Sequence, residues 1–240
     1  MVKIALNGFG RIGKLALRRL IDNDISVAFI NDKNGDPDLF AHLLEFDTVH
    51  GRWSRSISND SVSLTVDNQK IPVLHEENIV NLPLDEIDIV IDCTGFFKSE
   101  QLLAPYFNKG VQKVIVSAPV KTGSVANLVY GVNHNIYDPN MHNIVTAASC
   151  TTNCLAPIVN VVHESLGIKH GSITTIHNVT NTQTIVDRPS KDFRRSRSAL
   201  NSLIPTTTGS ATAINLIYPE LNGKLNGSAV RVPLLNASLT

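Results

Sequence analysis

The chain has 240 residues, of which 42% are hydrophobic, so it can bury one large core or two modest ones. Its 21 Lys and Arg residues balance its 21 Asp and Glu residues, which leaves no long-range field to attract nucleic acid or an anionic membrane surface. No apolar run approaches membrane-spanning length, and the chain reaches Asn and Gly too early for a signal peptide. Its three cysteines indicate neither a disulfide framework nor a zinc site, so we expect no metal and a reducing, cytoplasmic location.

The first elements predict a nucleotide-binding turn. An apolar strand is expected over residues 2–6, and the apolar spacing after residue 14 is typical of an amphipathic helix. Between them lies Gly-x-Gly-x-x-Gly, in which Gly8 allows a tight turn, Gly10 lets a pyrophosphate approach the backbone and Gly13 permits close packing. The cofactor-binding candidates in this turn are Asn7, Gly8, Phe9, Gly10, Arg11, Ile12 and Gly13.

A second strand, expected over residues 27–30, ends at Asn31 and Asp32. A carboxylate at this distance from the glycines can accept hydrogen bonds from both ribose hydroxyls, and its charge would repel a 2′-phosphate. We therefore expect NAD rather than NADP, with Asn31 and Asp32 at the cofactor. The simpler interpretation of Asp32 is a solvated carboxylate at the end of a strand.

The following elements are expected to complete this sheet. A short helix and inserted β segments are indicated over residues 39–44, 56–66 and 71–74. Buried-type strands over 88–92 and 113–116 flank a helix over 100–107, and the carboxyl ends of such strands line the cofactor crevice of a doubly wound sheet. We interpret Cys93 as a packing residue. The candidates at these strand ends, each of which could equally be a turn residue, are Thr94, Gly95, Phe96 and Ser117.

The most informative stretch surrounds Cys150. A strand is expected over residues 143–147, and a helix is expected to begin at Cys150 and stop at Gly167. Unpaired backbone N–H groups and the positive end of the helix dipole favour a thiolate there. A β run over 172–176 delivers His177, whose ring could support that thiolate and shuttle a proton. The alternative is a buried cysteine and a core histidine, but the polar Ser-Cys-Thr-Thr-Asn run favours a nucleophile.

A basic cluster, Arg194-Arg195-Ser196-Arg197, follows in a long polar segment. Aromatic residues are not interleaved with it, which argues against nucleic acid, whereas arginine binds phosphate oxygens well. The hydroxyl-rich run over 205–209 opens another expected helix over 211–217 and offers a second phosphate site. Strands are expected over 225–239, and Arg231 within them is a further anion-ligand candidate.

With these residues in hand, the chain resembles the glyceraldehyde-3-phosphate dehydrogenase family from end to end. The turn over 7–13, the highly specific signature over 148–157 and the runs 219–227 and 231–233 carry the resemblance. It implies an α/β fold with a Rossmann-type doubly wound sheet as the NAD-binding domain, residues 1–148. An α+β catalytic domain would follow, with residues 149–240 as its N-terminal part. Family members continue further, so we expect the chain to be incomplete and an isolated 1–240 polypeptide to be poorly soluble or inactive.

The resemblance also implies the chemistry, which is phosphorylating oxidation of glyceraldehyde 3-phosphate with NAD. Cys150 would be the nucleophile and His177 its acid–base partner. The substrate phosphate would bind Thr180 and Arg231, beside Thr182, where most members carry Asp. The implied ligands of inorganic phosphate are Ser149, Thr151, Arg195, Thr208 and Gly209. Family members are homotetramers, so a homotetramer is expected.

Three further possibilities concern substrate and role. The run 180–187 is similar to a branch associated with arsenate resistance, in which arsenate replaces phosphate as the acyl acceptor. Erythrose-4-phosphate dehydrogenase is the alternative within the enzyme class, although Thr180 and the run 206–209 fit the triose-phosphate enzyme better. Outside the enzyme class, the alternative is a non-catalytic nucleotide-binding or interaction module.

Overall fold

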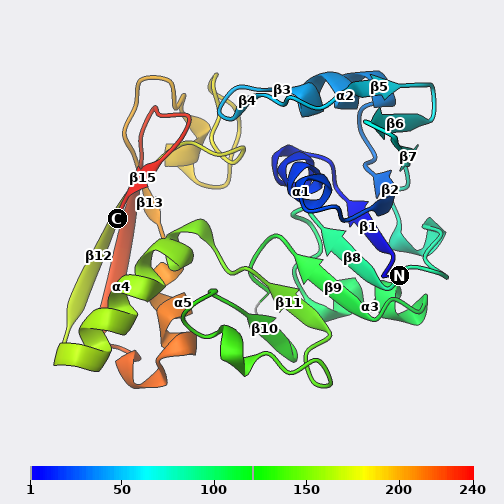
Figure 1. Cartoon of the computed structure of the whole chain (residues 1–240). Helices are drawn as coiled ribbons and strands as arrows, with labels where there is room; N and C mark the ends of the chain where they lie inside the picture. Colours follow the sequence, from blue (N-terminus) through cyan, green and yellow to red (C-terminus); the bar gives the residue numbers. More distant parts are fainter. Residues whose placement is uncertain (1, 121) are drawn as a thin grey trace. The chain divides into compact units, whose positions relative to one another are not determined.

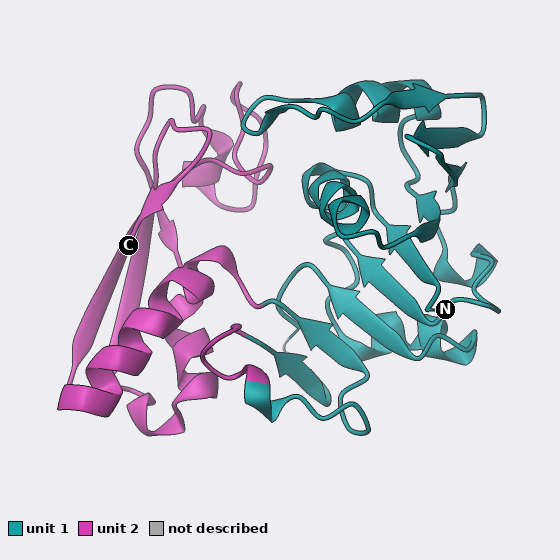
Figure 2. Cartoon of the chain, viewed as in Figure 1, with its two compact units in different colours: residues 1–128, 135–147 teal, residues 129–134, 148–240 magenta. Residues whose placement is uncertain are grey.

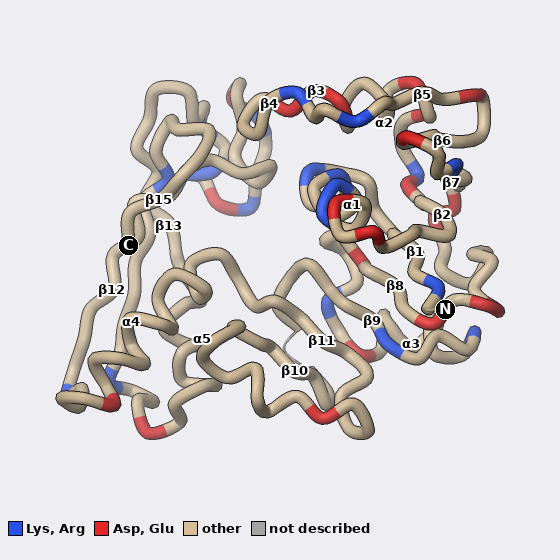
Figure 3. The backbone as a smooth tube through the Cα atoms, in the orientation of Figure 1, with Lys and Arg blue, Asp and Glu red and all other residues tan. Residues whose placement is uncertain are grey.

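A computed structural model describes residues 2–120 and 122–240, and the chain divides into two compact units (Figure 2). Unit 1 comprises residues 1–128 and 135–147, and unit 2 comprises residues 129–134 and 148–240. Basic and acidic positions are interspersed along both units (Figure 3). No helix in the described part of the chain has the length and apolar character needed to cross a membrane.

Unit 1 is built on a sheet whose described strands lie in the order β10-β11-β9-β8-β1-β2-β7-β6-β5 (Figure 1). Neighbours from β10 to β7 pair in parallel, and β6 and β5 extend the sheet antiparallel. This is the arrangement that alternating strands and helices favour. Its elements are β1 (Ile4–Asn7), α1 (Arg11–Asp22), β2 (Val27–Asn31), α2 (Pro37–Glu45), β3 (Phe46–Asp47), β4 (Gly51–Arg52), β5 (Ile57–Asn59), β6 (Ser63–Val66), β7 (Gln69–Leu74), η1 (Ile79–Asn81), β8 (Ile89–Asp92), α3 (Glu100–Asn108), β9 (Lys113–Val116), β10 (Val125–Asn127) and β11 (Ile144–Thr146).

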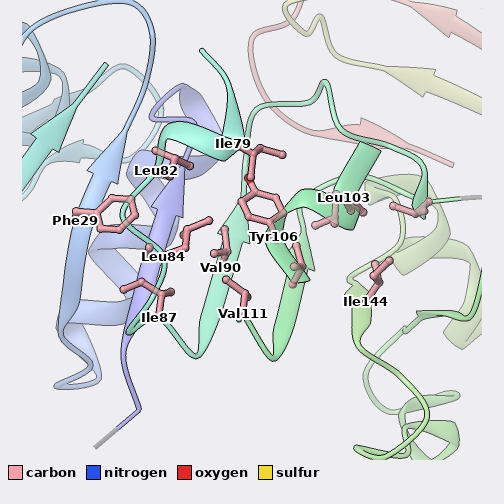
Figure 4. Close-up of a cluster of buried hydrophobic side chains, with 14 residues drawn as sticks. Phe29, Ile79, Leu82, Leu84, Ile87, Val90, Leu103, Tyr106, Val111 and Ile144 are labelled. Atoms are coloured by element: carbon pink, nitrogen blue, oxygen red, sulfur yellow. The ribbon is translucent and has the colours of Figure 1, made fainter. Parts of the chain in front are cut away.

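The two faces of this sheet are buried against different helices. Side chains alternate along a strand, so the neighbours Ala5 and Leu6 of β1 belong to separate apolar clusters. The cluster on the face of Ala5 includes Leu103 and Tyr106 of α3 (Figure 4), and the cluster on the face of Leu6 includes Leu17 of α1. Burial on both faces explains why the central strands are apolar throughout.

Unit 2 is built on a smaller sheet, with its described strands in the order β13-β14-β12-β15 and with β12 and β14 parallel (Figure 1). Helices α4 and α5 pack in one apolar cluster with Ile173 of β12, through Leu155 and Ile214. The short helix η2 (His134–Ile136) contains residues of both units. The other elements of unit 2 are α4 (Cys150–Leu166), β12 (Gly171–His177), η3 (Phe193–Ser196), β13 (Ile204–Thr207), α5 (Ser210–Ile217), η4 (Pro219–Leu221), β14 (Leu225–Arg231) and β15 (Ser238–Leu239).

Several expected elements are confirmed at or near their expected ends. The expected helix runs over Cys150–Leu166, and Gly167 follows it with φ 75, the left-handed conformation that glycine adopts readily. The strands expected over 225–239 are interrupted, because β14 ends at Arg231 and β15 covers only Ser238–Leu239. Pro233 cannot donate a ladder hydrogen bond and Ala237 has φ 70, so the backbone between the two strands leaves the extended conformation.

Candidate active site

Cys150 occupies the first position of α4, after a cap formed by Ser149. The Ser149 hydroxyl accepts a hydrogen bond from the Thr152 backbone N–H at 3.1 Å, which satisfies one of the free donors of the first turn. Ala148 precedes the cap with φ 55, a conformation uncommon for a residue with a side chain. By helix geometry the first-turn N–H groups of Cys150 and Thr151 have no intrahelical acceptor, so they can serve an anion or oxyanion.

The structure brings Cys150 and His177 together. The Cys150 Sγ lies 3.3 Å from His177 Nε2. Cys150 is exposed, so its sulfur is accessible to a substrate. His177 is buried at the end of β12, so the surrounding protein restricts the position of its ring. The pair has the contact needed for a nucleophile and its proton acceptor.

Arg231 lies beside His177 because of strand register. The strands β12 and β14 run parallel, and His177 is directly paired with Arg231. The Arg231 Nη1 lies 2.8 Å from His177 Nδ1 and 2.8 Å from the Asn178 carbonyl oxygen. Burial lowers the pKa of Arg231, the charge of the Cys150 sulfur opposes that shift, and neighbouring Arg195 adds to it. The sulfur therefore lies within electrostatic reach of a half-buried cation.

Arg195, the second basic candidate, comes from η3 and is pinned against β13. Its Nε donates to the Thr206 hydroxyl at 3.1 Å, and its Nη2 contacts the same oxygen. Because Arg195 lies close enough to Arg231 to lower its pKa, the two guanidinium groups favour an anion in their vicinity. Sequence reasoning missed Thr206 as the residue that orients Arg195.

The remaining phosphate candidates are held by local contacts. Thr180 and Thr182 hydroxyls lie 3.0 Å apart, and both contact Gln183 Oε1, at 3.1 and 3.3 Å. Thr208 contacts the Ser210 hydroxyl at 2.9 Å, and Gly209 is the N-terminal cap of α5. Sequence analysis did not identify Gln183. It is a polar residue within a polar loop, and only the structure shows that its side chain is buried. The binding roles of all these residues stay predictions.

In unit 1 the glycine-rich turn has the geometry that a dinucleotide requires. Gly8 has φ 92, and a Cβ there would lie 2.5 Å from the Thr94 nitrogen. A Cβ on Gly13 would lie 2.0 Å from the Gly8 oxygen, so helix α1 approaches β1 closely. A Cβ on Gly10 would meet no heavy atom within 4 Å, which leaves space for a ligand beside the backbone. The turn therefore fits NAD.

Two charged side chains beside this turn are already engaged by protein groups. Asp32 accepts from the Phe9 N–H at 2.7 Å and from the Asn34 N–H at 3.0 Å, and a carboxylate retains lone pairs beyond these for ribose hydroxyls. Arg11 donates to Asp47 at 2.5 Å. Burial raises the pKa of Asp47, but the Arg11 contact and two backbone N–H donors outweigh it and hold that pKa well below its usual range. Arg11 is thus tied to β3, the short strand that follows α2.

An open pocket of about 730 Å³ adjoins the turn. It is lined by six of the predicted cofactor residues, namely Asn7, Gly8, Asn31, Asp32, Thr94 and Phe96. Sequence analysis missed the others, which are Lys33, Asn34, Glu76, Glu77, Asn78 and Phe97. The predicted residues Phe9, Gly10, Arg11, Ile12, Gly13, Gly95 and Ser117 are not among its lining residues. The side chain of Ser117 instead hydrogen-bonds the thiol of Cys93, whose pKa burial raises to about 12, as expected of a packing residue.

A buried hydrogen-bond chain runs beneath the pocket. Asn31 Nδ2 donates to Asn7 Oδ1 at 2.7 Å, and Asn7 Nδ2 donates to the Tyr106 hydroxyl at 2.5 Å. Tyr106 donates to Asp92 at 2.7 Å, and the Thr94 hydroxyl donates to the other Asp92 oxygen at 2.7 Å. Burial raises the pKa of Asp92, and the Thr94 and Tyr106 hydrogen bonds oppose that shift. The chain links residues that line the pocket, and sequence analysis did not find its Tyr106 and Asp92 members.

Two family models and several individual proteins match this chain. The family model described as "Glyceraldehyde 3-phosphate dehydrogenase, NAD binding domain" matches residues 2–100, and the one described as "Glyceraldehyde 3-phosphate dehydrogenase, C-terminal domain" matches residues 149–240. Glyceraldehyde-3-phosphate dehydrogenase 3 of Nostoc sp. is 54% identical over 242 residues, covering 100% of this chain and 72% of the relative. The corresponding protein of Geobacillus stearothermophilus is 47% identical, covering 99% and 71%. Glyceraldehyde-3-phosphate dehydrogenase 1 of Bacillus cereus is 46% identical, covering 100% and 72%.

Proposed function

The chain belongs to the glyceraldehyde-3-phosphate dehydrogenase family, and on that premise we propose that it oxidises glyceraldehyde 3-phosphate and phosphorylates the product through Cys150. The expected fold class, NAD as the cofactor and membership among NAD-dependent oxidoreductases are confirmed. The observation that carries the proposal is the 3.3 Å contact between an accessible sulfur at a helix N-terminus and the Nε2 of a held histidine.

The first half of the proposed reaction uses Cys150 and His177. The thiolate adds to the aldehyde carbon, and the first-turn N–H groups of α4 can stabilise the oxyanion that develops. A proton from His177 Nε2 passes to this oxygen and completes the thiohemiacetal. NAD, when bound, supplies the hydride acceptor. His177 Nε2 takes the hydroxyl proton as the carbon loses its hydride, which leaves a thioester on the sulfur.

The second half transfers the acyl group from sulfur to phosphate. A phosphate oxygen attacks the thioester carbon, the carbon–sulfur bond breaks and Cys150 leaves as a thiolate. We assign inorganic phosphate to Ser149, Thr151, Arg195, Thr208 and Gly209. We assign the phosphate of the substrate to Thr180, Thr182 and Arg231. The closeness of Arg195 and Arg231 supports an anionic substrate.

NAD binding is assigned to unit 1 residues. The turn over 7–13 would hold the pyrophosphate, Asp32 the adenosine ribose, and Asn31, Thr94, Gly95, Phe96 and Ser117 would lie along the remainder of the cofactor. The open space at Gly10 and the free lone pairs of Asp32 support this assignment. We also propose the domain division 1–148 and 149–240, a homotetramer and a cytoplasmic location, all on the family resemblance.

Arsenate is the proposed alternative acceptor. Arsenate and phosphate have nearly the same shape and charge, so the same hydroxyl, N–H and guanidinium donors would bind either. The support for a role in arsenate resistance is the run 180–187.

The test is an NADH-formation assay on the purified full-length gene product with glyceraldehyde 3-phosphate and either phosphate or arsenate. Erythrose 4-phosphate serves as the competing aldehyde, and its specificity constant should be lower. Cys150→Ser should abolish turnover, whereas Cys154→Ser should retain it, because Cys154 is also exposed but lies one turn further along α4. Near-normal turnover of Cys150→Ser would refute the proposal, and the absence of activity with either aldehyde would favour a non-catalytic module.

A further inference from the structure

The chain contains four Asn-Gly pairs, and asparagine before glycine is prone to spontaneous loss of its side-chain amide. The glycine nitrogen gives its proton to solvent base and attacks the amide carbon of the asparagine. The bond from that carbon to the side-chain nitrogen breaks, ammonia leaves and a cyclic succinimide remains. Water then opens the ring at either carbonyl and yields aspartate or isoaspartate, with no change of oxidation state. The asparagines of the pairs are Asn7, Asn34, Asn222 and Asn226.

Two of the pairs are held in ways that prevent this attack. Asn7 is 4% exposed, and its side chain donates to Tyr106 and accepts from Asn31. The nitrogen of Gly8 donates to the Asn31 carbonyl oxygen at 2.7 Å. Asn226 lies within β14, where pairing with β12 holds its backbone extended. Neither asparagine can bring its amide carbon to the following nitrogen without breaking these contacts.

The pair Asn34-Gly35 is open to the reaction. It lies in the loop between β2 and α2, and both residues are exposed. Neither the Asn34 side-chain amide nor the Gly35 N–H has a hydrogen-bond partner among the described residues. Gly35 has φ 88, and a Cβ there would lie 2.5 Å from the Phe40 ring, so the loop requires glycine at this position. The fold therefore retains a glycine directly after an unrestrained asparagine.

Asn34 also lines the pocket of about 730 Å³ beside the glycine-rich turn. The charged residues of the same lining are Asp32, Lys33, Glu76 and Glu77. A carboxylate at position 34 would be the fourth acidic group beside a single lysine, and it would repel the diphosphate of NAD. Isoaspartate would also lengthen the backbone where the Asn34 N–H donates to Asp32 at 3.0 Å.

We propose that Asn34 is a site of spontaneous deamidation, that its conversion weakens NAD binding, and that bound NAD protects it. The inference rests on the proposed placement of NAD in this pocket. A bound cofactor fills the space beside Asn34, so the amide carbon can reach the Gly35 nitrogen only when NAD has left. Protein that is short of NAD would therefore lose cofactor affinity slowly and irreversibly.

Asn222 provides a control within the same molecule. Asn222 and Gly223 are both exposed, and Gly223 has φ 75, as in a turn. The Gly223 N–H has no hydrogen-bond partner among the described residues. Asn222 belongs to unit 2 and is not among the lining residues of the pocket. It should convert at a rate that does not depend on NAD.

The experiment follows the peptides of all four pairs by mass spectrometry while the full-length gene product is incubated at mildly alkaline pH. Asn34 and Asn222 should convert, and Asn7 and Asn226 should stay intact. NAD at about ten times its Kd should slow conversion of Asn34 about tenfold and leave Asn222 unchanged. In NADH titrations at low salt, Asn34→Asp should bind about fivefold more weakly than the wild type, and Asn222→Asp should bind equally. Incubated Asn34→Gln should keep its initial NADH affinity while that of the wild type declines.

Three results would overturn the inference. They are an Asn34 that stays intact while Asn222 converts, equal slowing of both sites by NAD, and wild-type NADH affinity in Asn34→Asp. Equal slowing would mean that NAD acts on the stability of the whole protein and not on the loop. Failure to oxidise glyceraldehyde 3-phosphate would refute the proposed function, but it would change neither the peptide masses nor the NADH titrations.

Discussion

The buried Tyr106 hydroxyl connects residues beneath the cofactor pocket, and Tyr106→Phe tests its contribution because the variant lacks only that oxygen. The side chain is 0% exposed, and its hydroxyl joins Asn7 Nδ2 at 2.5 Å to Asp92 at 2.7 Å. The variant keeps the ring within its apolar cluster but leaves a buried amide donor and a buried carboxylate oxygen short of a partner. At about 1–3 kcal/mol for each unsatisfied group, we expect a loss of roughly 2–4 kcal/mol in the free energy of unfolding.

The loss should depend on pH in a defined direction. Burial raises the pKa of Asp92 in the folded protein, so folding binds its proton more tightly and stability falls as rising pH ionises the carboxyl. The Tyr106 hydrogen bond opposes that rise by stabilising the ionised form. Tyr106→Phe lacks this hydrogen bond, so its loss of unfolding free energy should be largest above the folded-state pKa of Asp92. The loss should become smaller as the pH falls and the carboxyl takes up a proton.

Urea unfolding at neutral and mildly acidic pH measures the loss of stability and its pH dependence. NADH titration measures the affinity of the pocket for the cofactor. Tyr130→Phe is the matched control, because Tyr130 is 87% exposed and should change stability by less than about 0.5 kcal/mol. NADH affinity of Tyr106→Phe should fall, since Asn7 and Thr94 lose a common support. A loss below about 1 kcal/mol, or one that does not diminish in acid, would refute the account of the buried chain.

Three further predictions concern the Cys150 sulfur, the glycine turn and a buried cation. Iodoacetamide should modify Cys150 faster than Cys154, although both are exposed on α4, and equal rates in mass-spectrometric time courses would contradict the role of the helix N-terminus. Gly13→Ala places a Cβ 2.0 Å from a backbone oxygen and should cost about 2–3 kcal/mol in thermal or urea unfolding. Gly10→Ala meets no atom and should keep its stability while NADH titration shows weaker binding. Arg18 is 7% exposed and donates to the Leu44 and Glu45 carbonyl oxygens at the end of α2, so Arg18→Met should show a loss of about 2–4 kcal/mol in urea unfolding.

Much of the fold follows from local pattern. The start of α4 was predictable because a polar cap precedes apolar residues at three- and four-residue spacing, and its end because a glycine follows. Strands β8 and β9 of unit 1 were predictable because parallel strands buried on both faces are short apolar runs, whereas β3, β4 and β10 were not expected. The position of Asp32 at a strand end followed in the same way, since the strand itself was recognisable.

Contacts between distant segments could not be predicted. The pairing of His177 with Arg231 depends on the register of strands separated by a loop, a helix and another strand, and no local pattern encodes that register. The link between Tyr106 and Asp92 joins a helix to a strand, and a tyrosine on an apolar helix face gives no sign of the partner of its hydroxyl. The wall of the pocket at Glu76 follows β7, in a region whose irregular pattern gave no functional signal.

The residues assigned to the substrate phosphate lie at or beside buried N–H donors that have no partner among the described residues. Such donors favour a ligand that can only accept hydrogen bonds. Arg231 donates to protein acceptors through Nη1 while its buried Nε has no partner among the described residues. Thr180 and Thr182 direct their hydroxyls to Gln183 Oε1, while Gln183 Nε2 is likewise buried without a partner in that part of the chain. A phosphate dianion offers acceptors and no obligatory donors, so it can pair such groups where a neutral hydroxyl could pair only some of them. We therefore expect a preference for a charged ester over its dephosphorylated aldehyde, because the ester would leave fewer buried donors unpaired.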